Sequence, residues 1–96
     1  MDLGLTGKTA LVTGGSKGIG RAVARSLAAE GARVMICSRD AAPLAQAALD
    51  VERATGGRVE TVAADLSRHD EVVRVAKDAV ARLGRLDILV NNAGAI

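Results

Sequence analysis

The sequence predicts an α/β domain built on one doubly wound parallel sheet, with four strands and three helices in the order βαβαβαβ. Short apolar runs alternate with longer segments of helical periodicity, and no linker, tandem repeat or low-complexity tract divides the 96 residues. The length and the 49% content of hydrophobic residues fit a single domain, residues 1–96.

Four short apolar runs are predicted to form the strands, at residues 8–12, 34–37, 59–64 and 86–90. The second run, Val-Met-Ile-Cys, is apolar at every position. Continuous apolarity is expected of a strand that helices cover on both faces, so this run is placed inside the sheet. All four strands should be parallel and joined by right-handed crossovers.

The three segments between these runs are predicted to be helices. They cover residues 18–30, the segment from Asp40 to the glycines at 56–57, and residues 67–83. Ser67 and Asp70 have the spacing of a capping box. The side chains expected to face the sheet are Ile19, Val23 and Leu27 in the first helix, Leu44, Ala48 and Val51 in the second, and Val72, Ala76, Ala79 and Leu83 in the third.

Most of the unusual residues of the chain follow the predicted strands. These segments are residues 13–17, 38–40, 64–66 and 91–94. In a doubly wound sheet, ligands bind beyond the carboxyl ends of the strands, where the strand order reverses beside the first strand. The fold alone therefore predicts a ligand site formed by these four segments.

A glycine-rich loop links the first strand to the first helix. It consists of Gly14, Gly15, Ser16, Lys17, Gly18, Ile19 and Gly20. Free backbone N–H groups and the helix dipole attract an anion at such a place, and glycines let the backbone approach a pyrophosphate or adopt positive φ angles. The loop is therefore predicted to bind phosphate, with a tight turn that holds no ligand as the structural alternative.

A nucleoside-triphosphate loop is the nearest functional alternative, because Gly15 and Gly20 have its G-x4-G spacing. Arg21 and Ala22, however, stand where that loop requires Lys and then Ser or Thr. No hydroxyl is left at this place to bind magnesium. The segment therefore favours a dinucleotide.

Three motifs together closely resemble the short-chain dehydrogenase/reductase family. They are residues 13–20, Asp65 after the third predicted strand, and Asn91-Asn92-Ala93-Gly94 after the fourth. The resemblance covers the whole chain and implies a partial Rossmann-like domain that binds a nicotinamide cofactor. In that family the glycine loop holds the pyrophosphate, Asp65 and Leu66 would lie at the adenine, and Asn91, Ala93 and Gly94 would support the sheet and the nicotinamide riboside.

The end of the second strand bears on the choice of cofactor. An acidic side chain there would bind the 2′-hydroxyl of NAD and repel the 2′-phosphate of NADP. Ser38 occupies the position, Arg39 follows it, and Lys17 adds a second cation from the loop. We therefore expect NADP(H) to be preferred over NAD. The alternative is that both cations are ordinary solvated charges, and Asp40 is an opposing charge nearby.

The sequence lacks the catalytic group that the resemblance implies. Family members use a Ser and a Tyr-x-x-x-Lys pair after the asparagine motif, whereas this chain has no Tyr and stops at Ile96. We therefore expect the amino-terminal, cofactor-binding half of a carbonyl or alcohol oxidoreductase similar to the 3-oxoacyl-acyl-carrier-protein reductases, truncated before its catalytic segment. The alternative is a stand-alone, non-catalytic dinucleotide-binding or assembly module.

The surroundings of the domain can also be predicted. Ile88, Leu89 and Val90 should leave an apolar sheet edge for the missing half or for a partner chain, and the complete protein is expected to be a homo-oligomer. A net charge of +2 with no aromatic residue argues against nucleic-acid binding, and a lone Cys37 and a lone His69 argue against a metal site. With no membrane-length apolar run and no signal peptide, a cytoplasmic location is expected.

Overall fold

The computed structural model describes residues 4–16 and 18–92, and these residues form the predicted alternation of strands and helices. In chain order the elements are β1 (Thr9–Thr13), α1 (Gly18–Ala29), β2 (Arg33–Ser38), α2 (Ala41–Thr55), β3 (Val59–Ala63), α3 (His69–Leu83) and β4 (Ile88–Asn91). The predicted α/β fold class is therefore confirmed.

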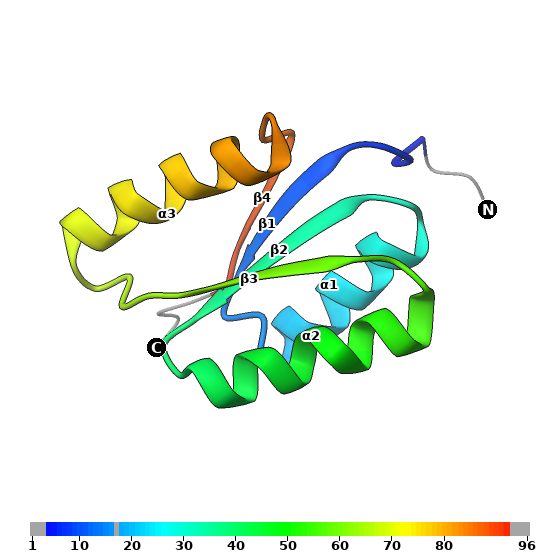
Figure 1. Cartoon of the computed structure of the whole chain (residues 1–96), viewed down its shortest axis with the longest axis horizontal. Helices are drawn as coiled ribbons and strands as arrows, with labels where there is room; N and C mark the ends of the chain where they lie inside the picture. The colour runs from blue at the N-terminus through cyan, green and yellow to red at the C-terminus, as the bar shows by residue number, and fades with distance from the viewer. Residues whose placement is uncertain (1–3, 17, 93–96) are drawn as a thin grey trace.

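The strands form one parallel sheet in the order β3-β2-β1-β4. The chain first steps outward from β1 through β2 to β3 and then returns across the sheet to β4, on the other side of β1. Helices α1 and α2 cover one face, and α3 covers the opposite face (Figure 1). The strand order thus reverses beside β1, where the sequence placed the ligand site.

The core has two layers, one on each face of the sheet. Val12 and Ile36 point toward α1 and α2, whereas Met35 and Cys37 point toward α3. All four side chains are fully buried. Strand β2 is therefore covered on both faces, as its continuous apolarity predicted, and complete burial of a side chain such as Ile36 stabilises the fold by about 1.5–3 kcal/mol.

The buried faces of two helices differ from the prediction, whereas Leu44, Ala48 and Val51 of α2 are buried as expected. In α1 the buried residues are Gly20, Ala24 and Ala28, and Ile19 is 74% exposed. In α3, Ala79 and Leu83 are buried as predicted and Val75 is buried with them, whereas Val72 and Ala76 are exposed. Because α1 approaches the sheet through its small side chains, Ile19 is displaced into solvent, whereas Val23 and Leu27 are partly buried and pack against the core as predicted.

The capping box predicted for α3 is wrong. The helix begins one residue later than that motif requires, with Arg68 as its N-cap and no capping bond from the Arg68 side chain. Ser67 instead donates its hydroxyl to Asp65 Oδ1 at 2.7 Å. The competing acceptor two residues upstream turns Ser67 back toward the end of β3, away from the helix.

Strand β4 is fixed to β1 at the amino end of the sheet by paired hydrogen bonds. The Thr9 backbone N–H donates to Asp87 Oδ2 at 2.9 Å, and the Asp87 N–H donates to the Thr9 carbonyl at 3.0 Å. The Thr9 hydroxyl donates to the Arg85 carbonyl at 2.6 Å. These bonds set the register in which β4 runs toward the ligand-binding edge.

None of the helices in the described part of the chain is long and apolar enough to cross a membrane.

Candidate dinucleotide site

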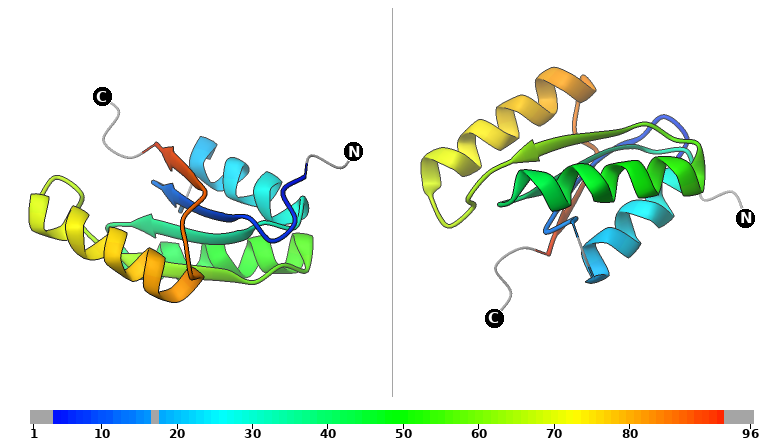
Figure 2. Two further views of the ribbon diagram at one scale, coloured as in Figure 1. Left: turned by 90° about the horizontal axis from the view of Figure 1, so that it is seen from above. Right: turned by 60° about the horizontal axis from the view of Figure 1, so that its bottom comes forward.

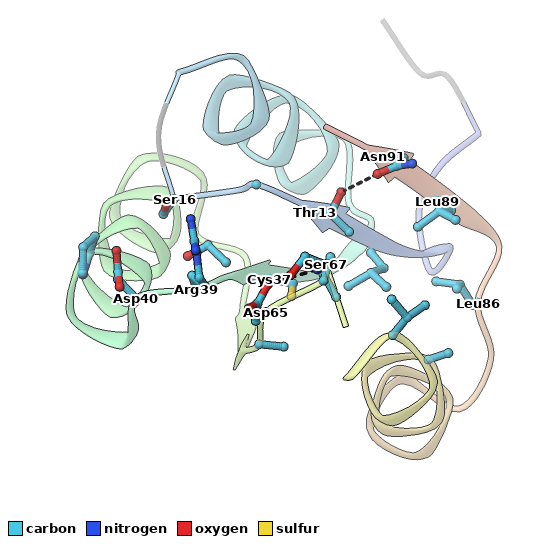
Figure 3. A pocket seen from close by; sticks show the side chains of 18 residues that line it. Thr13, Ser16, Cys37, Arg39, Asp40, Asp65, Ser67, Leu86, Leu89 and Asn91 are labelled. Atoms are coloured by element: carbon cyan, nitrogen blue, oxygen red, sulfur yellow. Dashed lines mark hydrogen bonds between the residues drawn. The ribbon is translucent and has the colours of Figure 1, made fainter. Parts of the chain in front are cut away.

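A cavity of about 870 Å³ opens at the carboxyl ends of the strands (Figure 3). All four segments that the sequence singled out contribute to its wall: Thr13, Gly14 and Ser16 from the first, Ser38, Arg39 and Asp40 from the second, Ala64, Asp65 and Leu66 from the third, and Asn91 from the fourth. The volume lies within the range of about 300–1,000 Å³ that small-molecule and cofactor sites usually have.

The glycine loop folds back onto β2 before α1 begins. The N–H groups of Gly14 and Gly15 donate to the Cys37 carbonyl at 2.7 and 3.3 Å. Gly14 and Gly18 have backbone φ angles of 67° and 61°. A residue that carries a Cβ adopts such positive angles only under strain. Two glycines are therefore required by the backbone path of the turn.

Gly15 and Gly20 are required for a different reason, the close packing of the loop. A Cβ on Gly15 would lie 2.7 Å from the Cβ of Ile36, and one on Gly20 would overlap the carbonyl group of Gly14. Asn92 Nδ2 would be only 2.9 Å from that added Cβ on Gly20. Contacts within the protein therefore exclude a side chain at both positions. This requirement is separate from the close approach of a ligand, which was the reason suggested by the sequence.

The carboxyl ends of β1 and β4 are joined through the hydroxyl of Thr13, which is 5% exposed. Thr13 Oγ1 lies 3.1 Å from Asn91 Oδ1 and 3.3 Å from the Val90 carbonyl, and it accepts the Asn92 backbone N–H at 2.9 Å. This contact orients the Asn91 side chain at the cavity (Figure 3). The sequence placed Thr13 and Asn92 in the segments of the site but gave neither an individual role; a polar residue at the end of an apolar strand was the available signal for Thr13.

The end of β2 presents two groups without partners. Ser38 Oγ is buried and forms no hydrogen bond. Arg39 is exposed and forms no hydrogen bond or ion pair with the residues that the structure describes. In Figure 3 its side chain extends along the cavity toward Ser16. No carboxylate of the described residues forms a salt bridge with this guanidinium, although the charge of Asp65 is close enough to interact with it. A hydroxyl and a cation are therefore available side by side where a dinucleotide-binding fold meets the 2′ position of the ribose.

Asp65 lies shortly after the end of β3, the strand next to β2, on the same side of the cavity as Arg39. Its Oδ1 accepts the Ser67 hydroxyl at 2.7 Å and the Ser67 N–H at 3.0 Å. These two bonds, in that order, lower the pKa of the Asp65 carboxyl, and the charge of Arg39 lowers it further. Asp65 is therefore an ionised hydrogen-bond acceptor at neutral pH, held in place by its own turn.

Four of the described residues that were predicted for the site do not line this cavity. Gly15, Gly18, Ile19 and Gly20 shape the loop and the first turn of α1 behind it. Lys17, Ala93 and Gly94 lie outside the described residues.

The other end of the cavity is apolar, and Leu89 of the predicted apolar sheet edge contributes to it. Leu11, Val72, Ala76, Leu86 and Leu89 line it, beneath and beside α3. Cys37 also contributes to the wall, but it is fully buried, and burial raises the pKa of its thiol. The polar half of the cavity thus continues into a hydrophobic space over β1 and β4.

A parallel sheet whose order reverses beside β1, with a glycine loop at that point, is the arrangement of a Rossmann-like α/β domain. The chain belongs to the short-chain dehydrogenase family, whose model matches residues 8–96. The family resemblance drawn from the glycine, Asp65 and asparagine motifs is thereby confirmed.

Individual relatives agree with this assignment. The rhamnolipids biosynthesis 3-oxoacyl-[acyl-carrier-protein] reductase of Pseudomonas aeruginosa is 47% identical over 90 residues, which are 94% of this chain and 34% of that protein. Another, the short chain dehydrogenase/reductase dpchG of Colletotrichum higginsianum, is 44% identical over 94% of this chain and 33% of its own length. The chain therefore spans about one third of these curated relatives.

Solved structures give the same fold. L-Sorbose reductase from Gluconobacter frateurii, crystallised with NADPH and L-sorbose, superposes with a TM-score of 0.93 at 41% identity, over 99% of this chain and 36% of that one. A metagenomic short-chain oxidoreductase in complex with NADP gives a TM-score of 0.88 at 45% identity, over 95% and 41% of the two chains. Both of these neighbours were solved with a nicotinamide dinucleotide.

Proposed function

We propose that this chain is the NADP(H)-binding part of a short-chain dehydrogenase/reductase-type oxidoreductase. The observation that carries the proposal is the end of β2, where the buried Ser38 hydroxyl lacks a partner and the Arg39 guanidinium is free of ion pairs in the described residues. A phosphate on the 2′ position of the adenosine ribose would accept from both groups. Arg39 can bind such a phosphate through two parallel N–H bonds.

The glycine loop supplies the proposed pyrophosphate site. Gly14 and Ser16 reach the cavity wall, and Gly15, Gly18, Ile19 and Gly20 hold the loop and the start of α1 in position. Backbone N–H groups at a helix N-terminus stabilise a phosphate by hydrogen bonding and by the helix dipole. Lys17 is proposed, from its place in the sequence, as a second cation for phosphate.

The two ends of the dinucleotide are assigned by the position of the remaining side chains. Asp65 and Leu66 lie on the same side as Arg39 and are proposed to contact the adenine, for which an ionised Asp65 offers an acceptor. Asn91 lies at the end of β4, fixed by Thr13, and is proposed to support the nicotinamide riboside. Ala93 and Gly94 complete that motif in the proposal.

A bound nicotinamide ring would supply the hydride that passes between cofactor and a carbonyl or alcohol substrate. The residues of this chain bind and orient the dinucleotide: Arg39 and Ser38 at one end, the loop in the middle, and Asn91 at the other. The chain contains no Tyr, and Asp65 is ionised, so none of these groups protonates a developing alkoxide. We therefore assign the proton donor and the substrate site to the further sequence that its relatives contain.

Calorimetric titration of the purified chain tests this proposal. NADP⁺ should bind with a one-to-one stoichiometry, whereas ATP with Mg²⁺ should bind more weakly, because the loop lacks the Lys and hydroxyl that a nucleoside-triphosphate loop uses. Arg39→Asp should weaken NADP⁺ binding. Arg58→Asp, at an exposed position on the amino side of β3, makes the same change of charge and should leave the NADP⁺ affinity unchanged. Absence of NADP⁺ binding by the folded chain, or tighter binding of ATP with Mg²⁺, would overturn the proposal.

A further inference from the structure

The turn that connects β3 to α3 is tied to its surroundings on two sides. The Ala64 backbone N–H donates to the Ser38 carbonyl of β2 at 2.9 Å. On the other side, Arg74 of α3 donates through Nη2 to the Ala63 carbonyl, also at 2.9 Å. The right view of Figure 2 shows β3 running between α2 and α3 before the chain turns back into α3. The backbone that leads into Asp65 is therefore bound both to the neighbouring strand and to the following helix.

Arg74 is itself held by Glu71, one turn earlier in α3. Its Nε donates to Glu71 Oε2 at 2.7 Å, and its Nη2 donates to Glu71 Oε1 at 3.3 Å. The hydrogen bond and charge of Arg74 lower the pKa of the Glu71 carboxyl, and a hydrogen bond from the Asp65 backbone N–H lowers it further. Glu71 is therefore an ionised acceptor for both Arg74 and Asp65. We call Glu71 and Arg74 the α3 clamp.

The α3 clamp holds the backbone of Asp65, whereas Ser67 holds its side chain. Both bonds from Ser67 go to Asp65 Oδ1. Oδ2 of the same carboxylate forms no hydrogen bond with the residues that the structure describes, and Asp65 lines the cavity (Figure 3). One oxygen is thus fixed by the turn and the other is available to a ligand. The position of that second oxygen depends on where the α3 clamp holds the backbone.

An ionised carboxylate with one free oxygen favours a base that donates a hydrogen bond. Adenine carries an exocyclic amino group, whereas hypoxanthine carries a carbonyl oxygen at the same ring position. The amino group would donate to the free oxygen of Asp65, but the carbonyl would place a second acceptor against it. A site built around such a bond discriminates against the analogue that lacks the donor.

We propose that Glu71 and Arg74 are positioning residues, which hold the Asp65 backbone where its free carboxylate oxygen selects a base that carries an amino group. The inference rests on the proposed function, because it requires the adenine of NADP(H) to lie beside Asp65. Neither residue of the α3 clamp lines the cavity, so both act through Asp65 and not by touching the nucleotide.

A second ion pair in α3 provides a matched control. Arg82 Nη1 donates to Asp78 Oδ2 at 3.2 Å and to the Thr61 carbonyl of β3 at 2.9 Å. This pair ties α3 to β3 in the same way as the α3 clamp, but at the middle of the strand. None of its three members lines the cavity. A loss of stability caused by loosening α3 should therefore appear when either pair is broken, whereas a change of base preference should appear only with the α3 clamp.

Calorimetric titration with NADP⁺ and with its hypoxanthine analogue tests the proposal in the wild-type chain, Glu71→Ala and Asp78→Ala. The wild type and Asp78→Ala should bind NADP⁺ at least about fivefold more tightly than the analogue. In Glu71→Ala this ratio should fall below about twofold, because only NADP⁺ loses the bond to a well-placed Asp65. Arg74→Lys should lower the ratio as well, and it keeps the charge of the pair if Glu71→Ala does not fold by circular dichroism.

A double-mutant cycle separates positioning from an independent role of the α3 clamp. Asp65→Ala should lose the base preference, and adding Glu71→Ala to it should cause no further loss of NADP⁺ affinity. Additive losses in the double variant would overturn the proposal.

Three further results would overturn it: a base preference that survives in the folded variants of the α3 clamp, an equal loss in Asp78→Ala, or a wild type that binds NADP⁺ and the analogue equally. All three leave the proposed function intact. Absence of NADP⁺ binding by the wild type would instead contradict the proposed function, and this inference with it.

Discussion

Gly20 is a position at which the fold tolerates only a hydrogen as side chain. An added Cβ would overlap the Gly14 carbonyl oxygen and lie 2.8 Å from its carbon. Gly20→Ala should therefore shift the loop, lower the free energy of unfolding by about 1–3 kcal/mol and abolish detectable NADP⁺ binding. Urea denaturation and calorimetric titration measure the two effects.

Ala22→Val is the matched control for Gly20→Ala, because Ala22 is exposed on the same helix. It adds two methyl groups at a place where they meet solvent, so NADP⁺ binding should be unchanged and the free energy of unfolding should fall by less than about 1 kcal/mol, the helix-propensity cost of a β-branched residue. A Gly20→Ala variant that is folded and retains full affinity would show that the close approach of α1 to the loop is dispensable for binding.

Thr13 joins the carboxyl ends of β1 and β4, the two strands between which the strand order of the sheet reverses. Thr13→Val keeps the shape of the side chain but removes the hydroxyl, which leaves the Asn92 N–H without its acceptor. The free energy of unfolding should fall by about 1 kcal/mol, the cost of losing the hydrogen bond of a partly buried group. Thr61→Val, on β3, is the control and should change stability by less than about 0.5 kcal/mol. Equal urea midpoints for the two variants would contradict this role of Thr13.

At the scale of elements, Asp87 couples β4 to β1 and gives the fold a pH dependence. The Thr9 backbone N–H is the main cause of a lowered pKa for the Asp87 carboxyl, and Arg85 adds to it. The folded-state pKa lies below the unfolded value of about 3.9, so the stabilisation by ionised Asp87 is complete above about pH 3.9. It is lost as the pH falls through the folded pKa.

Asp87→Asn should therefore unfold at a lower urea concentration than the wild type at pH 7, and the difference should shrink as the pH falls below about 4. Asp70→Asn, which breaks only an exposed pair with Arg68, is the control and should change the midpoint little. A wild-type advantage over Asp87→Asn that stays constant down to the most acidic pH tested would contradict the assignment of Asp87.

The elements themselves could be predicted because each strand is a short apolar run and each helix a periodic segment. The face that each helix buries against the sheet was harder to predict. Ile19 was expected in the core because periodicity favours large apolar residues, yet α1 packs through Ala24 and Ala28. Val72 was expected against the sheet because α3 has two apolar stripes and the sequence does not state which one faces β2.

The sequence predicted which segments form the candidate site, but it did not predict the hydrogen bonds between individual side chains. Parallel strands place their carboxyl ends together, so Ser38, Asp65 and Asn91 could be assigned to one cavity from their positions in the sequence. The hydrogen bonds of Thr13 and Ser67 could not, because they depend on the register of β4 and on the turn after β3. Both features arise only when distant or competing partners are placed in space.

At the scale of the whole molecule, the 96-residue chain should bind NADPH without catalysing hydride transfer. Proton donation to a developing alkoxide contributes about 10²- to 10⁴-fold to a carbonyl reduction, and the chain has no Tyr to provide it. Purified chain with NADPH and a panel of ketones and thioesters should consume cofactor no faster than buffer, as followed by the absorbance of NADPH. Reproducible turnover that Gly20→Ala abolishes would contradict this division of roles.

The preference between NADPH and NADH tests the central claim most directly. Fluorescence titration should give NADPH an affinity at least about tenfold higher than that of NADH, since one charge-assisted bond to the 2′-phosphate contributes about 1.5–3 kcal/mol. Because Arg39 is exposed, the preference should decrease as salt is added. Arg39→Asp should reverse the preference, because a carboxylate at the end of β2 repels the phosphate and accepts from a 2′-hydroxyl. Equal affinity for the two cofactors, or an undiminished preference for NADPH in Arg39→Asp, would contradict the proposed site.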